Sequence, residues 1–309
     1  MRRLMVGLLV TGCVMAATVG DAAAETARKG PAAHQPAPIA WSQVSGPSDG
    51  VVQSIGGYAA GCIAGARALA AEGPGYQVIR LSRKRNYGHP VLIDFLEDFG
   101  RKVSAAGLGT ALIGDMGQAR GGPMSFGHAS HQNGLDADVW LRLDLPPMAR
   151  RAREHLTEIK YVDYGQRRVS AEWTDAQARM IRIAASDPRV ERIFVNPAIK
   201  QAMCRRDWPE RSFLRKLRPW HGHDGHMHIR LSCPPGSPQC EGQKELPEGE
   251  GCGDEVRSWM ASLAPLVERP PGQSRPRAVS LPPVCRSVLR ASGTTVATVE
   301  DAAAEVDPR

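Results

Sequence analysis

Most histidines of the chain lie in two short segments. Residues 221–231 (HGHDGHMHIRL) contain four of its nine histidines, and residues 125–140 contain two more together with two aspartates. Imidazole and carboxylate groups are ligands that Zn²⁺ prefers, and a catalytic zinc keeps three protein ligands and one open position. The two segments therefore predict a zinc site to which both contribute.

The pattern within each segment is that of a β-strand, whose side chains alternate between two faces. In residues 226–231 (HMHIRL) both histidines and the arginine share one face, and in residues 135–141 (LDADVWL) both aspartates share a face. We expect these to be neighbouring strands whose polar faces meet. A ligand set of His131, Asp138 and His228 would leave one position open. Hydrogen-bonded histidines without a metal, or a purely structural zinc, are the alternatives.

The remaining polar groups of these segments fit hydrolysis. A zinc ion lowers the pKa of a bound water toward ~7 and polarises a carbonyl. His226, on the face of His228, is placed to take the proton of that water and pass it to a leaving amine. His223 is placed to hydrogen-bond a developing oxyanion. Asp136 either orients a ligand histidine or is a solvated carboxylate.

The elements that position these groups can be read from the hydrophobic pattern. Residues 76–82 and 191–196 have the composition of strands, and residues 90–106 carry an apolar helical stripe. Thr174 and Gln177 form the capping box that begins another helix. The sequence predicts an α+β fold, a mainly antiparallel sheet with flanking helices, in one domain over residues 49–290 that forms the floor of a zinc cleft.

The ends of the chain differ in composition from this domain. Residues 1–24 have the basic start, apolar run and small-residue end of an export signal, and no transmembrane segment is expected. The alternative is a lipoprotein anchor at Cys13. Residues 25–48 are rich in Pro and Ala and predict a linker, and residues 291–309 predict a frayed tail.

Charge and cysteine content indicate the compartment and the partners. The signal holds two arginines and one aspartate, so the net charge of +7 becomes +6 after its removal. This charge favours an anionic cell-envelope polymer, and no nucleic-acid-binding module is recognisable. The mature chain keeps six cysteines, none in a C-x-x-C pair. We expect three disulfides in an oxidising compartment rather than buried free thiols.

Residues 114–141 (GDMGQARGGPMSFGHASHQNGLDADVWL) and 219–240 (PWHGHDGHMHIRLSCPPGSPQC) resemble the penicillin-insensitive murein endopeptidases. These belong to the superfamily of lysostaphin, the D-Ala-D-Ala metallopeptidases and hedgehog. The signature H-x6-D followed by H-x-H is met by His131, Asp138 and residues 226–228. The resemblance runs from about residue 50 to about residue 290 and implies a disulfide-stapled fold of the same type.

The resemblance implies a zinc-dependent peptidase of the periplasm that cuts D-alanyl–meso-diaminopimelate cross-links between peptidoglycan stem peptides. It implies that His131, Asp138 and His228 are the metal ligands and that His226 is the unligated base. It also matches His128, as an extra ligand, and His223 to active-site histidines.

Further expectations depend on the same resemblance. Asp115 and Arg120 lie in family-like stretches and are predicted to contact substrate, although a turn or ion-pair role is the alternative for each. Arg120 and Arg230 would meet carboxylates of the stem peptide, for which a guanidinium is well suited. The resemblance implies the disulfides Cys62–Cys285, Cys204–Cys252 and Cys233–Cys240.

A different class of function remains open from the sequence. A zinc-containing module of the cell envelope that binds without catalysis would keep the same ligands. Such a module has no need for an unligated histidine beside the metal, so His226 distinguishes the two hypotheses. The sequence leaves the oligomeric state open, with a homodimer as one alternative.

Overall fold

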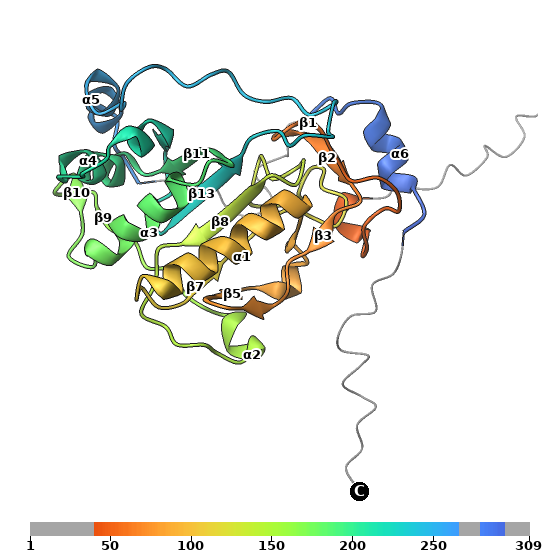
Figure 1. The fold of residues 1–309 in the computed structure, drawn as a ribbon, viewed down its shortest axis with the longest axis horizontal. Helices are drawn as coiled ribbons and strands as arrows, with labels where there is room; N and C mark the ends of the chain where they lie inside the picture. The colour runs from red at the N-terminus through yellow and green to blue at the C-terminus, as the bar shows by residue number, and fades with distance from the viewer. Residues whose placement is uncertain (1–39, 266–278, 294–309) are drawn as a thin grey trace, which may run out of the picture. The chain divides into compact units, whose positions relative to one another are not determined.

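A seven-stranded sheet forms the centre of the computed structural model, which describes residues 40–265 and 279–293 (Figure 1). Its strands, in spatial order, are β12 (Leu217–Pro219), β11 (Val190–Val195), β13 (His226–Leu231), β8 (Asp136–Trp140), β7 (Ala111–Ile113), β5 (Tyr76–Val78) and β4 (Glu72–Gly73). The two histidine-bearing segments are therefore the third and fourth strands, at the middle of the sheet.

The sheet is mixed, which corrects the expectation of a mainly antiparallel one. The pairs β5–β7 and β11–β12 are parallel, and the other neighbours are antiparallel. Parallel neighbours need a crossover connection. The helix α1 (Pro90–Ala105) lies in the connection from β5 to β7, and α4 (Pro197–Arg205) lies in the connection from β11 to β12.

Smaller elements surround the sheet. Three two-stranded antiparallel sheets are β1 (Gln53–Gly57) with β2 (Ala60–Ala64), β3 (Arg67–Ala68) with β6 (Tyr87–Gly88), and β9 (Val162–Asp163) with β10 (Arg168–Val169). The other helices are α2 (Arg150–Arg153), α3 (Asp175–Ala185), α5 (Asp254–Ala261) and α6 (Val284–Arg290). Three 3₁₀ turns are η1 (Trp41–Gln43), η2 (Leu81–Arg83) and η3 (Ser212–Lys216). None of the helices in the described ranges is long and apolar enough to span a membrane.

The two helices predicted from sequence are confirmed, with identifiable start signals. Pro90 occupies the first turn of α1, where its missing N–H costs nothing, and the Nδ1 of His89 accepts from the Val91 N–H. The capping box of α3 is present, since the Thr174 hydroxyl accepts from the Ala176 N–H and the Gln177 side chain accepts from the Thr174 N–H.

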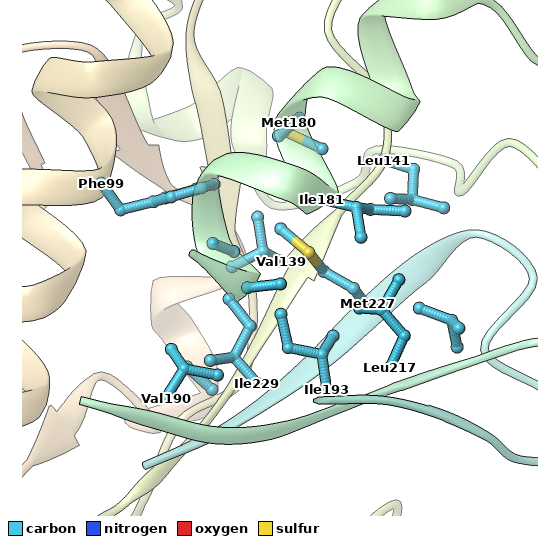
Figure 2. Close-up of a cluster of buried hydrophobic side chains, with 14 of the residues drawn as sticks. Phe99, Val139, Leu141, Met180, Ile181, Val190, Ile193, Leu217, Met227 and Ile229 are labelled. Carbon is cyan, nitrogen blue, oxygen red and sulfur yellow. The ribbon is translucent and has the colours of Figure 1, made fainter. Parts of the chain in front are cut away.

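These helices bury their apolar stripes against one face of the sheet. Figure 2 shows Phe99 of α1 and Met180 of α3 around Val139, Met227 and Ile229 of the central strands. All five side chains are at most 1% exposed. Because burial of each such side chain contributes about 1.5–3 kcal/mol, this packing fixes which face of β8 and β13 is left for polar groups.

One predicted strand is shorter than expected. Residues 76–82 were expected to be extended, but β5 ends at Val78 and a 3₁₀ turn follows at Leu81–Arg83. Arg80 and Lys84, which flank this turn, have φ values of 55° and 53° in the left-handed region. The apolar pattern of the sequence does not reveal such a turn, because the buried Ile79 continues the pattern beyond the end of β5.

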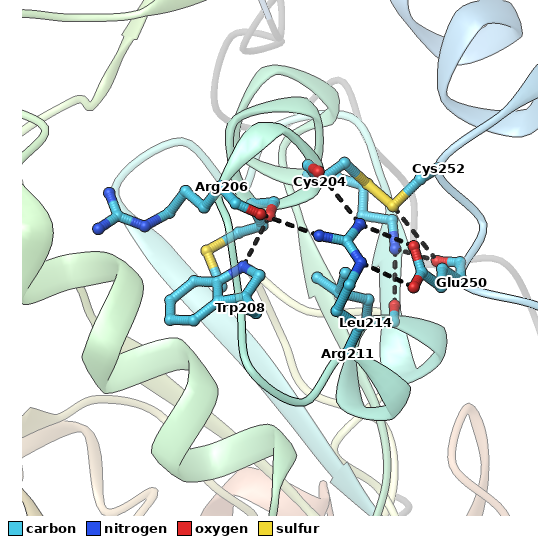
Figure 3. Close-up of a disulfide and its surroundings, with 9 residues drawn as sticks. Cys204, Arg206, Trp208, Arg211, Leu214, Glu250 and Cys252 are labelled. Carbon is cyan, nitrogen blue, oxygen red and sulfur yellow. Dashed lines mark hydrogen bonds and ion pairs between the residues drawn. A yellow bond between two sulfur atoms is a disulfide. The ribbon is translucent and has the colours of Figure 1, made fainter.

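The six cysteines of the described residues form three disulfides, in the pairs that the resemblance implies: Cys62–Cys285, Cys204–Cys252 and Cys233–Cys240. Figure 3 shows Cys204–Cys252, which joins the end of α4 to the segment before α5. Beside it the Arg211 guanidinium makes two bonds to the Glu250 carboxylate, at 2.7 and 2.8 Å. The bridge and the ion pair together fix the segment that leads into α5.

The predicted terminal segments are described only in part. The 3₁₀ turn η1 and the residues up to 48 belong to the predicted linker. The predicted signal of residues 1–24, with Cys13, lies outside the described residues, as do residues 25–39 of the linker and residues 294–309 of the tail.

Candidate metal centre and active site

The pairing of β8 with β13 brings the polar faces of the two histidine-bearing segments together. The strands are antiparallel, with His228 opposite Asp138, Arg230 opposite Asp136 and His226 opposite Trp140. Directly opposed residues of an antiparallel pair lie on the same face of the sheet, about 4.5–5.5 Å apart. The predicted neighbouring strands and their shared polar face are therefore confirmed.

Asp138 lies at the centre of a group of four histidines. Its carboxylate oxygens are 3.2 Å from the Nδ1 of His228, 3.5 Å from the Nε2 of His131, 3.4 Å from the Nδ1 of His128 and 3.9 Å from the Nε2 of His226. Among the described residues, no lysine or arginine forms an ion pair with this carboxylate. Asp138 is 4% exposed, so its charge is balanced only by imidazole groups.

His131 shows most clearly that this group of side chains fits a metal ion. Its ring is fully buried, and neither ring nitrogen has a hydrogen-bond partner; the same is true of Asp138 Oδ1. Buried polar atoms without partners cost about 1–3 kcal/mol each. The ligand atoms of His128, His131 and Asp138 lie within 4.8 Å of one another, so this group could hold a metal ion that satisfies the three atoms.

The backbone around His131 is held in an uncommon conformation. Its φ of 67° lies in the left-handed region, and its N–H donates to Asp136 Oδ2 at 3.0 Å. Asp136 is fully buried and also receives the guanidinium of Arg230 through two bonds, at 2.8 and 2.9 Å. The Asp136 carboxylate thus fixes the loop that bears His131, and its Oδ1 lies 3.4 Å from the Nε2 of His228.

The protonation of the two buried ligand candidates differs. Burial lowers the pKa of His131 to about 4, so that ring is neutral and one of its nitrogens, set by the tautomer, offers a lone pair to a metal. Burial also opposes charge on His228, but Asp136 and Asp138 outweigh it and raise the pKa to about 9. The carboxylates therefore attract a positive charge to this position, and a metal dication would supply it.

His128 lies on the more exposed side of the group, with 23% of its side chain accessible. Its Nε2 is 3.0 Å from Asp115 Oδ2, which leaves Nδ1 facing Asp138. Asp115 also pairs with Arg83 and Arg85, at 2.9 and 2.8 Å. Burial opposes ionisation of Asp115, but these neighbours hold its pKa well below the usual range. Asp115 is thus an orienting partner of His128.

A second carboxylate orients His226. The Nδ1 of His226 is 2.6 Å from Glu158 Oε1, and Lys160 and Asp224 extend the ion-pair chain at 2.7 and 2.9 Å. A carboxylate accepts, so Nδ1 carries the proton and the neutral ring presents the lone pair of Nε2 toward Asp138. Burial lowers the pKa of His226, but Asp138 and Glu158 outweigh it and raise the pKa.

The sequence of this structure matches one family over nearly the whole described region. The profile of the penicillin-insensitive murein endopeptidases matches residues 54–290. The chain belongs to this family. The penicillin-insensitive murein endopeptidase of Haemophilus influenzae is 44% identical over 257 residues, covering 82% of this chain and 88% of that protein. Those of Klebsiella pneumoniae and Shigella sonnei are each 43% identical over 253 residues, covering 81% of this chain and 90% of each relative.

Arg230 and Arg120, which were predicted to bind substrate, make their contacts with other residues of the protein. The Arg230 guanidinium lies between the rings of Tyr58 and Phe194, 4.1 and 5.0 Å from their centroids, and its donors face Asp136 and Gln243. Arg120 is 7% exposed and donates to the backbone carbonyls of Gly46, Val288, Leu289 and Ala291. Burial and these bonds leave neither guanidinium free for a stem-peptide carboxylate.

Glu158 is the site residue that sequence reasoning missed. It lies in an irregular segment, 68 positions before His226, and no spacing or periodicity connects the two. The indirect signal is Gly225, immediately before His226, since a Cβ at that position would collide with the Glu158 side chain. A glycine here permits the close approach of the carboxylate to the histidine strand.

His223 is close to this group but is oriented differently from the prediction. Its φ of 51° is in the left-handed region, and its Nδ1 is 2.9 Å from the His221 carbonyl oxygen. A carbonyl only accepts, so Nδ1 carries the proton and Nε2 of the neutral ring is an acceptor. Burial lowers the pKa of His223 to about 3, which keeps the ring neutral. The ring centroid of His223 is 5.1 Å from that of His226.

Proposed function

We propose that the chain is a zinc-dependent murein endopeptidase that hydrolyses D-alanyl–meso-diaminopimelate cross-links of peptidoglycan. The observation that carries the proposal is the buried Asp138 surrounded by four histidines, three of which have a second carboxylate partner. Family membership supports murein as the substrate, because the curated relatives are named as murein endopeptidases.

We assign the metal to His131, Asp138 and His228, with His128 approaching from the exposed side. The unpartnered nitrogens of His131 and the unpartnered Oδ1 of Asp138 fit this role, and nitrogen and carboxylate ligands suit zinc. A zinc ion held there would polarise the scissile carbonyl and lower the pKa of a water molecule. Asp115 and Asp136 orient the ligands, as the hydrogen-bonded carboxylates behind metal-binding histidines commonly do.

His226 is the proton carrier of the proposed reaction. Its Nε2 has a lone pair because Glu158 accepts the proton of Nδ1, and Nε2 faces the Asp138 side of the site. The ring can take the proton of the attacking water while Glu158 stabilises the imidazolium. It can then give the proton to the leaving amine of diaminopimelate.

His223 takes a different role from the predicted one. An oxyanion needs a hydrogen-bond donor, but the contact of Nδ1 with the His221 carbonyl leaves Nε2 as an acceptor in the neutral ring. We assign His223 to accept an N–H of the substrate peptide beside His226. The expectation of an oxyanion donor does not fit a ring whose pKa is lowered to about 3.

The disulfides and the names of the relatives as murein endopeptidases support a location outside the cytoplasm. Disulfides persist in oxidising compartments, and three are present in the described residues. We assign the periplasm, reached by the predicted signal of residues 1–24. The stem peptides of cross-linked peptidoglycan are the proposed partner.

Digestion of purified cross-linked muropeptide dimers, followed by mass spectrometry with and without a zinc chelator, tests the proposal. We expect chelator-sensitive conversion of the dimer into two monomers, with the bond identified by the product masses. His226→Ala should retain stoichiometric zinc and lose activity, whereas His228→Ala should lose both. Intact dimer with zinc bound would instead support a binding module without catalysis, for which the His226–Glu158 pair has no use.

A further inference from the structure

Three rings pack together beside the histidine cluster, and we call them the aromatic ledge: Trp220 and His221 are exposed, and Trp259 is half-buried. The ring centroids of Trp220 and Trp259 are 5.9 Å apart, and those of His221 and Trp259 are 5.0 Å apart. Trp220 follows β12 and Trp259 lies on α5, so two separate elements build the ledge.

The ledge is unusual for the surface of this protein. Among the described residues only four large apolar side chains are exposed, and they are Val51, Phe126, Trp220 and Val279. Trp220 is 52% exposed, with the ring of Trp259 beside it. Isolated apolar side chains are common on surfaces, but two exposed rings packed against a third, half-buried ring favour a contact site.

The ledge is continuous with the proposed active site. The ring of Phe194 is 5.6 Å from Trp220 on one side and 5.4 Å from His228 on the other, measured between ring centroids. The greatest possible separation of Trp220 from His228 is therefore about 11 Å. A ligand that reaches the metal group can contact the ledge at the same time.

The chemistry of the ledge favours an uncharged, ring-shaped ligand. Arg218 pairs with Glu255 beside the ledge, so these two neighbouring charges neutralise each other. An aromatic face packs well against the C–H face of a sugar ring, and the His221 ring can hydrogen-bond sugar hydroxyl or acetamido groups. On α5, the exposed Asp254 and Arg257 also pair with each other, so the charged neighbours of the ledge are engaged in pairs.

We propose that the aromatic ledge binds the N-acetylated sugar of the glycan strand from which the cleaved stem peptide hangs. This inference rests on the proposed function, because it takes murein as the substrate. In murein the scissile bond lies three to four residues from the sugar, and an extended residue spans about 3.3–3.6 Å, so the separation is roughly 10–14 Å. The upper limit of about 11 Å between the Trp220 and His228 centroids lets a stem peptide of this length reach from the ledge to the metal group.

Two substrates separate recognition of the sugar from cleavage of the peptide. One is the cross-linked dimer with its muramyl sugars attached, and the other is the same dimer after an amidase has removed the sugars. With the zinc-loaded enzyme, Trp220→Ala should lower kcat/KM on the first substrate by about five- to tenfold and leave the second within about twofold. Trp220→Phe should retain most of the preference, and Val51→Ala, an exposed site in another region, serves as the control.

Binding of peptide-free glycan strands gives a readout that does not depend on catalysis. Trp fluorescence of the wild-type protein should change saturably with these strands, and Trp220→Ala should lose the response. Equal losses of kcat/KM on both substrates would mean that the ledge contacts the peptide, and unchanged values on both would mean that it contacts neither; either result overturns the proposal. If the wild type cleaves neither substrate, the proposed function fails, while the glycan titration still decides the ledge.

Discussion

Replacing Glu158 by Gln isolates the effect of one carboxylate on the proposed base. The substitution keeps the shape of the side chain and removes its charge. Glu158 Oε1 is 2.6 Å from the Nδ1 of His226, and the carboxylate is only 20% exposed. A hydrogen bond to a charged group contributes about 1.5–3 kcal/mol, and that contribution is largest when the ring becomes an imidazolium during proton transfer.

A loss of about 2 kcal/mol in the transition state corresponds to a fall of about 30-fold in kcat. The amide can also turn its NH₂ group toward Nδ1, which would move the ring proton to Nε2 and remove the base. Zinc content and KM should stay near their wild-type values, because Glu158 contacts His226 and none of the assigned metal ligands His131, Asp138 and His228. Steady-state cleavage of a cross-linked muropeptide dimer, with metal analysis of the same sample, measures all three quantities.

The pH profile adds a second readout with a definite sign. The Asp138 and Glu158 carboxylates raise the pKa of His226, so loss of the Glu158 charge lowers that pKa. The basic form of the ring then persists to lower pH, and the acidic limb of kcat/KM should move downward in Glu158→Gln. Glu154→Gln is the matched control, because Glu154 lies in the same segment and bonds to Ser82 instead.

Two results would refute this reasoning. A kcat within about threefold of wild type would show that Glu158 does not stabilise the imidazolium to the extent that its distance implies. Loss of zinc from Glu158→Gln would show that the carboxylate maintains the metal site itself. In the second case the fall in kcat would carry no information about His226.

Two further substitutions test the support of the site. Gly225→Ala places a Cβ against the Glu158 side chain and 2.7 Å from the Ile159 carbonyl oxygen, so kcat should fall as in Glu158→Gln with zinc retained. The control is Gly57→Ala, whose Cβ meets nothing within 4 Å. Equal activity of the two variants would contradict the packing argument. Arg230→Met leaves the buried Asp136 without its guanidinium and should destabilise the fold by about 3–5 kcal/mol, lowering Tm by about 10 °C in calorimetry. Arg142→Met, which breaks a pair with the exposed Asp144, should change Tm little, and a similar small change in Arg230→Met would mean that the Asp136 pair is not needed.

The sequence predicted the central strands well because their side chains are sorted by burial. Met227 and Ile229 pack into the core and Asp138 and His228 do not, and a period of two is unambiguous when one face is apolar. The starts of α1 and α3 could be predicted equally well, since helix capping depends on residues that are close in sequence. These local signals located the histidine cluster before any contact was known.

What the sequence did not show depends on contacts between distant residues. The parallel pairs arise from crossovers through α1 and α4, and strand composition does not specify direction. Arg230 looked available for substrate because an alternating pattern reports the face of a side chain and not its partners. Glu158 had only the indirect signal of Gly225, because its approach to His226 depends on the path of an irregular segment.

The position of β8 and β13 in the sheet has a consequence for how the protein moves. They are the fourth and third of seven strands, and all five residues of β8 are buried. Amide groups in such strands exchange with solvent only when the whole domain opens. We therefore expect the backbone amides of Asp138 and His228 to be among the slowest to exchange in the molecule. The two remaining candidate ligands, His131 and His128, lie instead in the loop before β8.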